Sequence, residues 1–164
     1  MNPVFPSSSR VKMGRKIVVV SGHFQFCHRG HVDYLRRAKE FAGPDGLLYV
    51  IVNSDHQSVL KKGFSFVPQE DRMALLEAVR YTDKVVLSVD MDRTVRQTLR
   101  SLCDADGARP THFANGGDVD VCAEEDACRD LGIEMVYGLG DKIQSSSWIL
   151  EHSVRAAYLN MSAA

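Results

Sequence analysis

A ten-residue run between an apolar stretch and an amphipathic stretch constrains the fold of this chain more than any other segment. The run is Gly22-His23-Phe24-Gln25-Phe26-Cys27-His28-Arg29-Gly30-His31, after the β-branched residues 16–21 and before the helical pattern 32–41. We expect a strand over 17–21, a helix over 32–41, and a turn between them. A helix N-terminus offers unpaired N–H groups and positive potential, and imidazoles add further donors. The turn therefore predicts a site for nucleotide phosphates.

Strand and helix patterns alternate along the rest of the chain. Strands are expected at 47–53, 84–89, 112–114 and 133–137, and helices at 69–80, 95–102, 124–131 and 147–159. The polar segment 53–63 is expected to be a loop. This alternation predicts the α/β class, with a Rossmann-like doubly wound parallel sheet in a single domain. Such sheets bind ligands beyond the carboxyl ends of their strands, where the glycine-rich segments of this chain fall.

Bulk properties indicate one globular domain. The chain has 164 residues, 45% hydrophobic and 25% charged, and a formal net charge of −1, so nothing in its charge favours nucleic-acid or membrane binding. We expect a flexible leader over 1–14, the domain over 15–160, and a frayed tail beyond. The four cysteines form no Cys-x-x-Cys pair, which favours reduced thiols and a cytoplasmic location.

The opening motif carries a family resemblance. The string Gly-x-Phe-x-x-x-His-x-Gly-His resembles the signature of the HxGH nucleotidyltransferases, and within them the cytidylyltransferases that act on small phosphorylated acceptors. Further segments in the same order extend the resemblance over about residues 15–152. It implies transfer of CMP from CTP to a small phosphate- or phosphonate-bearing acceptor, with release of pyrophosphate.

Within the opening motif, the resemblance implies that His28 and His31 contact the triphosphate and stabilise charge in the transition state. Gln25 stands where the family usually has Asp, and we assign it to acceptor binding. This departure removes a charge near the site. The nucleotide-binding residues implied for this segment are Gly22, His23, Phe24 and Gly30.

Two basic segments follow the second expected strand. The segment 53–63 resembles the family's Asp…Lys loop, which implies a catalytic role for Lys61 and acceptor binding by Lys62. The segment 68–72 resembles the family's Glu-x-x-Arg helix, which makes Arg72 a catalytic candidate. Arg72 either binds the acceptor phosphate or locks a loop through an ion pair with Glu70 or Asp71.

Two later segments complete the expected site. The turn at 115–118 resembles the family's Gly-Asp turn near the base and ribose, which assigns Asn115, Gly117 and Asp118 to nucleotide binding. The segment 142–150 resembles the family's Ile-Ser-Ser/Thr-Thr motif, at the head of the last expected helix. It assigns acceptor binding to Lys142, and nucleotide binding to Ser145, Ser146 and Ser147.

The expected cofactor is Mg²⁺ held by the substrate phosphates and water rather than by a protein cage. The expected partners are CTP and the acceptor, and either a second copy of the chain or the other domains of a longer enzyme. Two alternatives stay open: an adenylyltransferase of the same fold, and a non-catalytic nucleotide-binding module, which Gln25 keeps under consideration. A class I tRNA synthetase shares the His-x-Gly-His turn, but this chain is too short for one.

Overall fold

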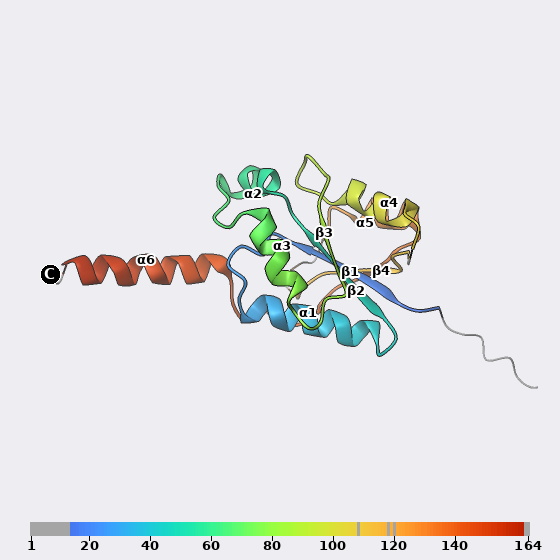
Figure 1. Cartoon of the computed structure of the whole chain (residues 1–164), viewed down its shortest axis with the longest axis horizontal. Helices are drawn as coiled ribbons and strands as arrows, with labels where there is room; N and C mark the ends of the chain where they lie inside the picture. Colours follow the sequence, from blue (N-terminus) through green and yellow to red (C-terminus); the bar gives the residue numbers. More distant parts are fainter. Residues whose placement is uncertain (1–13, 108, 118, 120, 163–164) are drawn as a thin grey trace, which may run out of the picture.

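Five parallel strands form one sheet in the order β3-β2-β1-β4-β5. The structure is a computed structural model that describes residues 14–107, 109–117, 119 and 121–162. The strands are β1 (Ile17–Gly22), β2 (Leu47–Val52), β3 (Lys84–Leu87), β4 (His112–Ala114) and β5 (Glu134–Val136). The sequence-based prediction of a parallel α/β sheet is therefore confirmed (Figure 1).

Helices cover both faces of this sheet. They are α1 (Arg29–Ala42), α2 (Asp55–Lys62), α3 (Gln69–Glu77), α4 (Arg96–Asp104), α5 (Glu125–Leu131) and α6 (Ser146–Ser162). Val18 and Val20 of β1 pack with the buried residues of α1 and α3, whereas Ile17 and Val19 pack with those of α4 and α5. The strands read as continuous apolar runs because both of their faces are buried.

The segment after β2 corrects one prediction, because it forms helix α2 rather than a loop. Ser54 caps the helix by accepting a hydrogen bond from the Gln57 backbone N–H at 3.2 Å, and the Gln57 side chain accepts one from the Ser54 N–H at 3.0 Å. This reciprocal capping box satisfies two donors that a helix start leaves open. The helix places Lys61 and Lys62 in its last turn.

The sheet order sets the position of the ligand site. The chain builds β2 and β3 on one side of β1 and then crosses to β4 on the other side. The loops that follow β1 and β4 therefore open at the point where the strand order reverses, which is where doubly wound folds bind their ligands.

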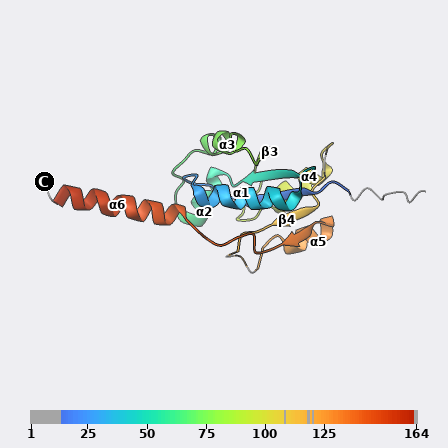
Figure 2. The same ribbon diagram turned by 90° about the horizontal axis from the view of Figure 1, so that it is seen from below.

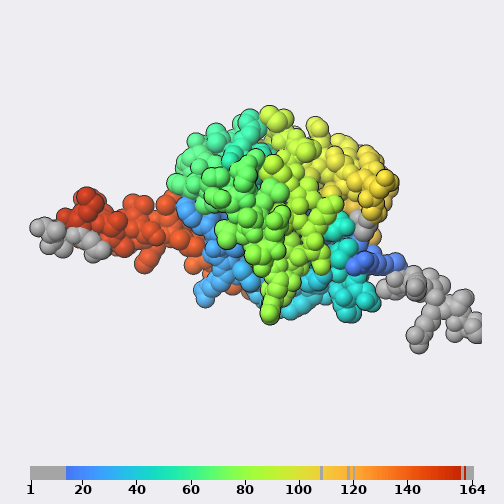
Figure 3. Space-filling model, in the orientation of Figure 1, coloured from blue at the N-terminus to red at the C-terminus, as the bar shows by residue number. Residues whose placement is uncertain are grey.

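Helix α6 leaves the body of the protein at this same edge. It projects outward in both ribbon views and in the space-filling view (Figures 1, 2 and 3). It continues to Ser162, beyond the expected helix end at 159, and its residues 151–159 are all exposed. Among the described residues, no helix is long and apolar enough to cross a membrane. The expected leader falls almost entirely outside the described residues, so the domain limits 15–160 stay a prediction.

Candidate active site

A pocket of about 510 Å³ lies beyond the carboxyl ends of β1 and β4. Its walls come from the loops after β1, β4 and β5, the end of α2 and the first turns of α1 and α6. Most of the site residues predicted from the sequence line this one pocket. They are His23, Phe24, Gln25, His28, Gly30, His31, Lys61, Lys62, Asn115, Gly117, Lys142, Ser145, Ser146 and Ser147.

The two motif histidines stack against each other at the start of α1. Their ring centroids are 3.8 Å apart, with an interplanar angle of 20°. His28 is the N-cap, and its Nδ1 accepts a hydrogen bond from the Gly30 N–H at 3.2 Å. The proton of the neutral His28 ring is therefore on Nε2. His28 Nε2 and His31 Nδ1 are both buried and have no hydrogen-bond partner among the described residues, which suits a ligand oxygen.

Burial keeps these imidazoles neutral in the free protein. It lowers the pKa of His31 from its usual 6.5 to about 3, with smaller effects from His28 and Lys62. Burial also lowers the pKa of His28. The pKa of His23 falls to about 3, first through burial and then through neighbouring cations that include Lys61. Neutral histidines near pH 7 act as hydrogen-bond donors and acceptors rather than as fixed charges.

Lysines supply the positive charge of the pocket. Lys61 and Lys62 reach it from the last turn of α2, and Lys142 enters from the segment before α6. The carboxylate of Asp33 also lines the pocket, but Arg36 at 2.7 Å and Arg37 at 2.8 Å hold it in ion pairs. The pocket therefore concentrates cations in a chain whose net charge is close to zero.

The first turn of α6 forms a further part of the pocket wall. Ser145 Oγ accepts a hydrogen bond from the Trp148 N–H at 3.2 Å and so caps this turn. The Ser146 hydroxyl donates to the backbone carbonyl of Gln25, which attaches α6 to the opening motif. Two helix N-termini therefore border one pocket, an arrangement that favours a polyanion.

Glycines allow close backbone contacts at the rim. The Gly117 N–H donates to the Gly140 carbonyl at 2.8 Å, and a Cβ on Gly117 would lie 2.1 Å from that oxygen. A Cβ on Gly30 would lie 3.0 Å from the His28 ring. The loops that carry Gly117 and Gly140 pack together only because glycine has no side chain. Asp118, the other residue predicted in this turn, lies outside the described residues.

Gly22 is placed differently from the prediction, because it does not line the pocket. A Cβ at this position would lie 3.0 Å from the ring of Phe24, which is buried beside β1. Gly22 therefore makes room for a core side chain, and its contact with the nucleotide stays a prediction.

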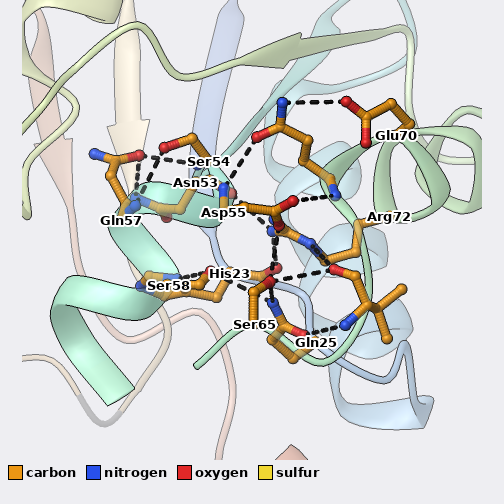
Figure 4. A network of polar contacts seen from close by, with 12 residues as sticks. His23, Gln25, Asn53, Ser54, Asp55, Gln57, Ser58, Ser65, Glu70 and Arg72 are labelled. Atoms are coloured by element: carbon orange, nitrogen blue, oxygen red, sulfur yellow. Dashed lines mark hydrogen bonds and ion pairs between the residues drawn. The ribbon is translucent and has the colours of Figure 1, made fainter. Parts of the chain in front are cut away.

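The structure also corrects the direct role expected for Arg72. The Arg72 side chain is fully buried and outside the pocket lining. Its guanidinium donates to the carbonyls of Val67 at 2.9 Å, His23 at 2.5 Å and Asn53 at 2.7 Å. It pairs with Asp55 at 2.7 Å, rather than with Glu70 or Asp71 as predicted (Figure 4). Arg72 thus joins the chain segments that follow β1 and β2.

Gln25 lines the pocket, but its side chain bonds to protein groups instead of facing open space. Its Nε2 donates to Ser65 Oγ at 2.9 Å, with a longer contact to Ser58 Oγ at 3.4 Å (Figure 4). Its Oε1 accepts from the backbone N–H groups of Phe66 at 3.1 Å and Val67 at 2.9 Å. Direct acceptor binding by this side chain is therefore not supported, and Gln25 positions the segment 65–67.

Residues of α2 that support the site were not among those predicted from the sequence. Asp55 accepts hydrogen bonds from Ser65 and Arg72, and Ser58 Oγ bonds to His23 Nδ1 at 2.9 Å. The Ser-x-x-Gln capping pattern at 54–57 identifies the helix from sequence. Its period then places Asp55, Ser58 and Lys62 on one face.

Among the described residues, no three or more His, Cys, Asp and Glu side chains converge to form a metal cage. The described carboxylates that line the pocket are those of Asp33 and Asp141. Such a donor set fits a cation held mainly by a ligand's own phosphates.

Comparison with known proteins places this architecture in a family. A family model described as cytidylyltransferase-like matches residues 19–139. The bifunctional protein HldE of Cronobacter sakazakii is 35% identical over 135 residues, which cover 74% of this chain and 28% of that protein. The FAD synthase of Methanopyrus kandleri is 30% identical over 113 residues, which cover 69% of each protein. The chain thus spans about 28% of the length of HldE.

A solved structure supports the fold. The lipopolysaccharide core biosynthesis protein of Thermoplasma volcanium superposes with a TM-score of 0.62 at 23% identity, covering 80% of this chain and 100% of that one. This likeness concerns the fold alone. Because the family model spans most of the sheet and the FAD synthase matches over two thirds of both chains, this protein belongs to the cytidylyltransferase-like family of nucleotidyltransferases.

Proposed function

We propose that this protein transfers CMP from CTP to a small phosphate- or phosphonate-bearing acceptor and releases pyrophosphate. The observation that carries the proposal is the stacked pair His28 and His31 at the start of α1, whose buried Nε2 and Nδ1 atoms have no partner among the described residues and lie beside a lysine-rich pocket. The family supports nucleotidyl transfer, and its cytidylyltransferase-like description supports CTP.

In this reaction an oxygen of the acceptor phosphate forms a bond to the α-phosphorus of CTP. The bond from that phosphorus to the oxygen bridging the α- and β-phosphates breaks, and pyrophosphate leaves with the electron pair. A phosphate monoester has a second pKa near about 6, so its oxygen is already largely deprotonated at pH 7. The reaction therefore needs positioning and charge stabilisation more than it needs a strong base.

The residues of the pocket suit that requirement. The His28 Nε2–H donates toward the α- or β-phosphate, and His31 beside it adds a second imidazole. Lys61 and the first turn of α6 offset the charge that grows on the leaving pyrophosphate. Lys62 and Lys142 attract the anionic acceptor and reduce its repulsion from the triphosphate.

Magnesium would enter with the triphosphate and neutralise part of its charge. We assign no protein cage to it, and the pocket carboxylates of Asp33 and Asp141 are the described groups nearest in chemistry to its needs. Because two arginines already hold Asp33, Asp141 is the better candidate to contact the hydrated ion.

Adenylyl transfer is the second candidate function. The relative from Methanopyrus kandleri carries the name FAD synthase, and FAD contains an adenine nucleotide. ATP as the donor would use the same phosphate contacts, so the choice between CTP and ATP depends on the base-binding loops around Asn115. The expected second copy or additional domain, and the cytoplasmic location, stay predictions.

The test is pyrophosphate release with magnesium, measured for the four nucleoside triphosphates against a panel of phosphate and phosphonate acceptors. We expect CTP-dependent release with at least one acceptor, and its loss in His31→Ala. The matched control is His152→Ala, because His152 is exposed on α6 and outside the pocket. Release with ATP alone would establish the second candidate, and nucleotide binding without release for any pair would establish a binding module instead.

A further inference from the structure

A second hollow of about 580 Å³ adjoins the active-site pocket, between α6 and the segment that follows α2. We call it the phenylalanine groove. Its apolar lining is formed by Phe26, Phe64, Phe66, Leu150, Val154 and Tyr158. Phe64 and Phe66 are 44% and 45% exposed, so two large aromatic side chains lie open at its surface. Aromatic surface exposed in a concave site is typical of ligand binding.

The phenylalanine groove shares part of its lining with the active-site pocket. Gln25, Lys62, Ser146 and Ser147 line both of them. The Ser146 hydroxyl bonds to the Gln25 carbonyl at this boundary. Lys62 therefore faces the phosphate side and the apolar side at once, and Arg155 adds a second cation within the groove.

The three phenyl rings form one cluster with Phe66 at its centre. The Phe66 ring centroid lies 5.2 Å from that of Phe26, at an interplanar angle of 38°, and 4.2 Å from that of Phe64, at 55°. Tilted rings at these separations offer faces and edges to a further planar group.

Two local features shape the segments that carry this cluster. Phe26 has a positive φ of 49°, in the left-handed region that bulky residues rarely adopt. The side chain of Gln25 fixes the segment that carries Phe66, because it accepts hydrogen bonds from the backbone N–H groups of Phe66 and Val67. The backbone thus accepts strain at Phe26 in a loop that also carries the active-site residues, which is where such strain is concentrated in proteins.

From this arrangement we infer that the acceptor is a phosphate monoester carrying a planar aromatic group. The aromatic group stacks in the phenylalanine groove, and the phosphate reaches past Lys62 into the active-site pocket. The inference rests on the proposed function, which it deepens by naming the substrate class. A second copy of the chain is the competing occupant, and the lining that the groove shares with the active-site pocket, Lys62 included, favours the acceptor.

Binding is tested first, without nucleotide, by calorimetric titration of 1-naphthyl phosphate and glycerol 3-phosphate into the full chain. We expect 1-naphthyl phosphate to bind about tenfold more tightly or better, as expected for a new ring-stacking contact. Phe66→Ala should remove about that factor. It leaves the backbone bond to Gln25 in place and truncates a half-exposed side chain, so the fold is retained. The control is Leu75→Ala, which removes exposed apolar surface from α3, away from the groove.

Turnover then separates this inference from the proposed function. The readout is the ratio of kcat/KM for the naphthyl acceptor to that for glycerol 3-phosphate. We expect the ratio to exceed about ten and to fall toward one in Phe66→Ala. If the naphthyl acceptor binds through Phe66 but no triphosphate supports release, the groove assignment stands and the proposed function fails.

Four results would overturn the inference. The first is equal affinity for the two acceptors, and the second is an equal effect of Phe66→Ala and Leu75→Ala. The third is a dimer in light scattering that Phe66→Ala converts to a monomer while naphthyl phosphate fails to bind, which would assign the groove to a second copy. A hexyl phosphate bound as tightly as the naphthyl ester would refute the aromatic specificity.

Discussion

Replacing Arg72 with methionine tests whether this buried arginine holds the ends of β1 and β2 together. Methionine retains part of the aliphatic volume but removes all of the donors. The carbonyls of His23, Asn53 and Val67 then lose a charged donor, and Asp55 loses its ion pair. Each unpaired buried acceptor costs about 1–3 kcal/mol. Water reaches the partly exposed Asp55, which limits the cost of losing its ion pair. For all four lost bonds together we expect the free energy of unfolding to fall by about 3–5 kcal/mol.

The assay is urea unfolding followed by circular dichroism at pH 7, with Arg80→Met as the matched control. Arg80 is exposed, so its replacement should change the free energy of unfolding by less than about 0.5 kcal/mol. A loss below about 1 kcal/mol for Arg72→Met would show that the four bonds add little to the free energy of unfolding. It would refute the idea that Arg72 holds the ends of β1 and β2 together.

The pH dependence gives a second check. Burial raises the pKa of Asp55, but bonds from Ser65, Arg72 and Gln69 outweigh this and lower it. The contribution of the ion pair is therefore present above the usual pKa of 3.8 and is lost as the pH falls through the lower folded value, which narrows the gap between wild type and Arg72→Met.

Three further predictions concern the pocket. His28→Ala and His31→Ala should each lower kcat by on the order of 10²-fold while the circular dichroism spectrum stays unchanged, because each removes a transition-state donor; near-wild-type turnover in both would reject the assigned site. Gly117→Ala should weaken nucleotide binding in calorimetry, since its Cβ would lie 2.1 Å from a backbone oxygen, whereas Gly14→Ala meets no atom within 4 Å and should bind normally. Burial lowers the pKa of His23 and His31 to about 3, so the unfolded chain binds more protons between about pH 3 and 6.5. The urea midpoint should therefore fall as the pH is lowered from 7 to 5, and less so in His31→Ala; a flat profile would contradict the burial.

The parts of this protein that could be predicted from the sequence are those formed by residues close together along the chain. The strand, turn and helix around His28 are consecutive, so their apolar period and glycine positions identify them directly. The same holds for the two lysines before Gly63, although the capping residues that make their segment a helix were overlooked. Local patterns therefore identified a set of residues, most of which line one pocket.

The side-chain bonds of the site could not be predicted in this way. Arg72 donates to the carbonyl of His23, 49 positions earlier, and Gln25 accepts from Phe66 and Val67, more than 40 positions later. No period or motif reports such pairings, because they depend on how β1 and β2 lie side by side. Both residues looked like ligand contacts in sequence because charged and amide side chains near a motif often bind substrates. Burial reveals them as internal supports.

Helix α6 has a mechanical consequence. Its first turn is part of the pocket wall, fixed by the bond from Ser146 to the opening motif, whereas residues 151–159 stand in solvent. At 1.5 Å per residue, its 17 residues extend for about 25 Å. Because its first turn is the part fixed to the opening motif, a tilt about that turn displaces the exposed end of α6 further than it displaces the pocket wall.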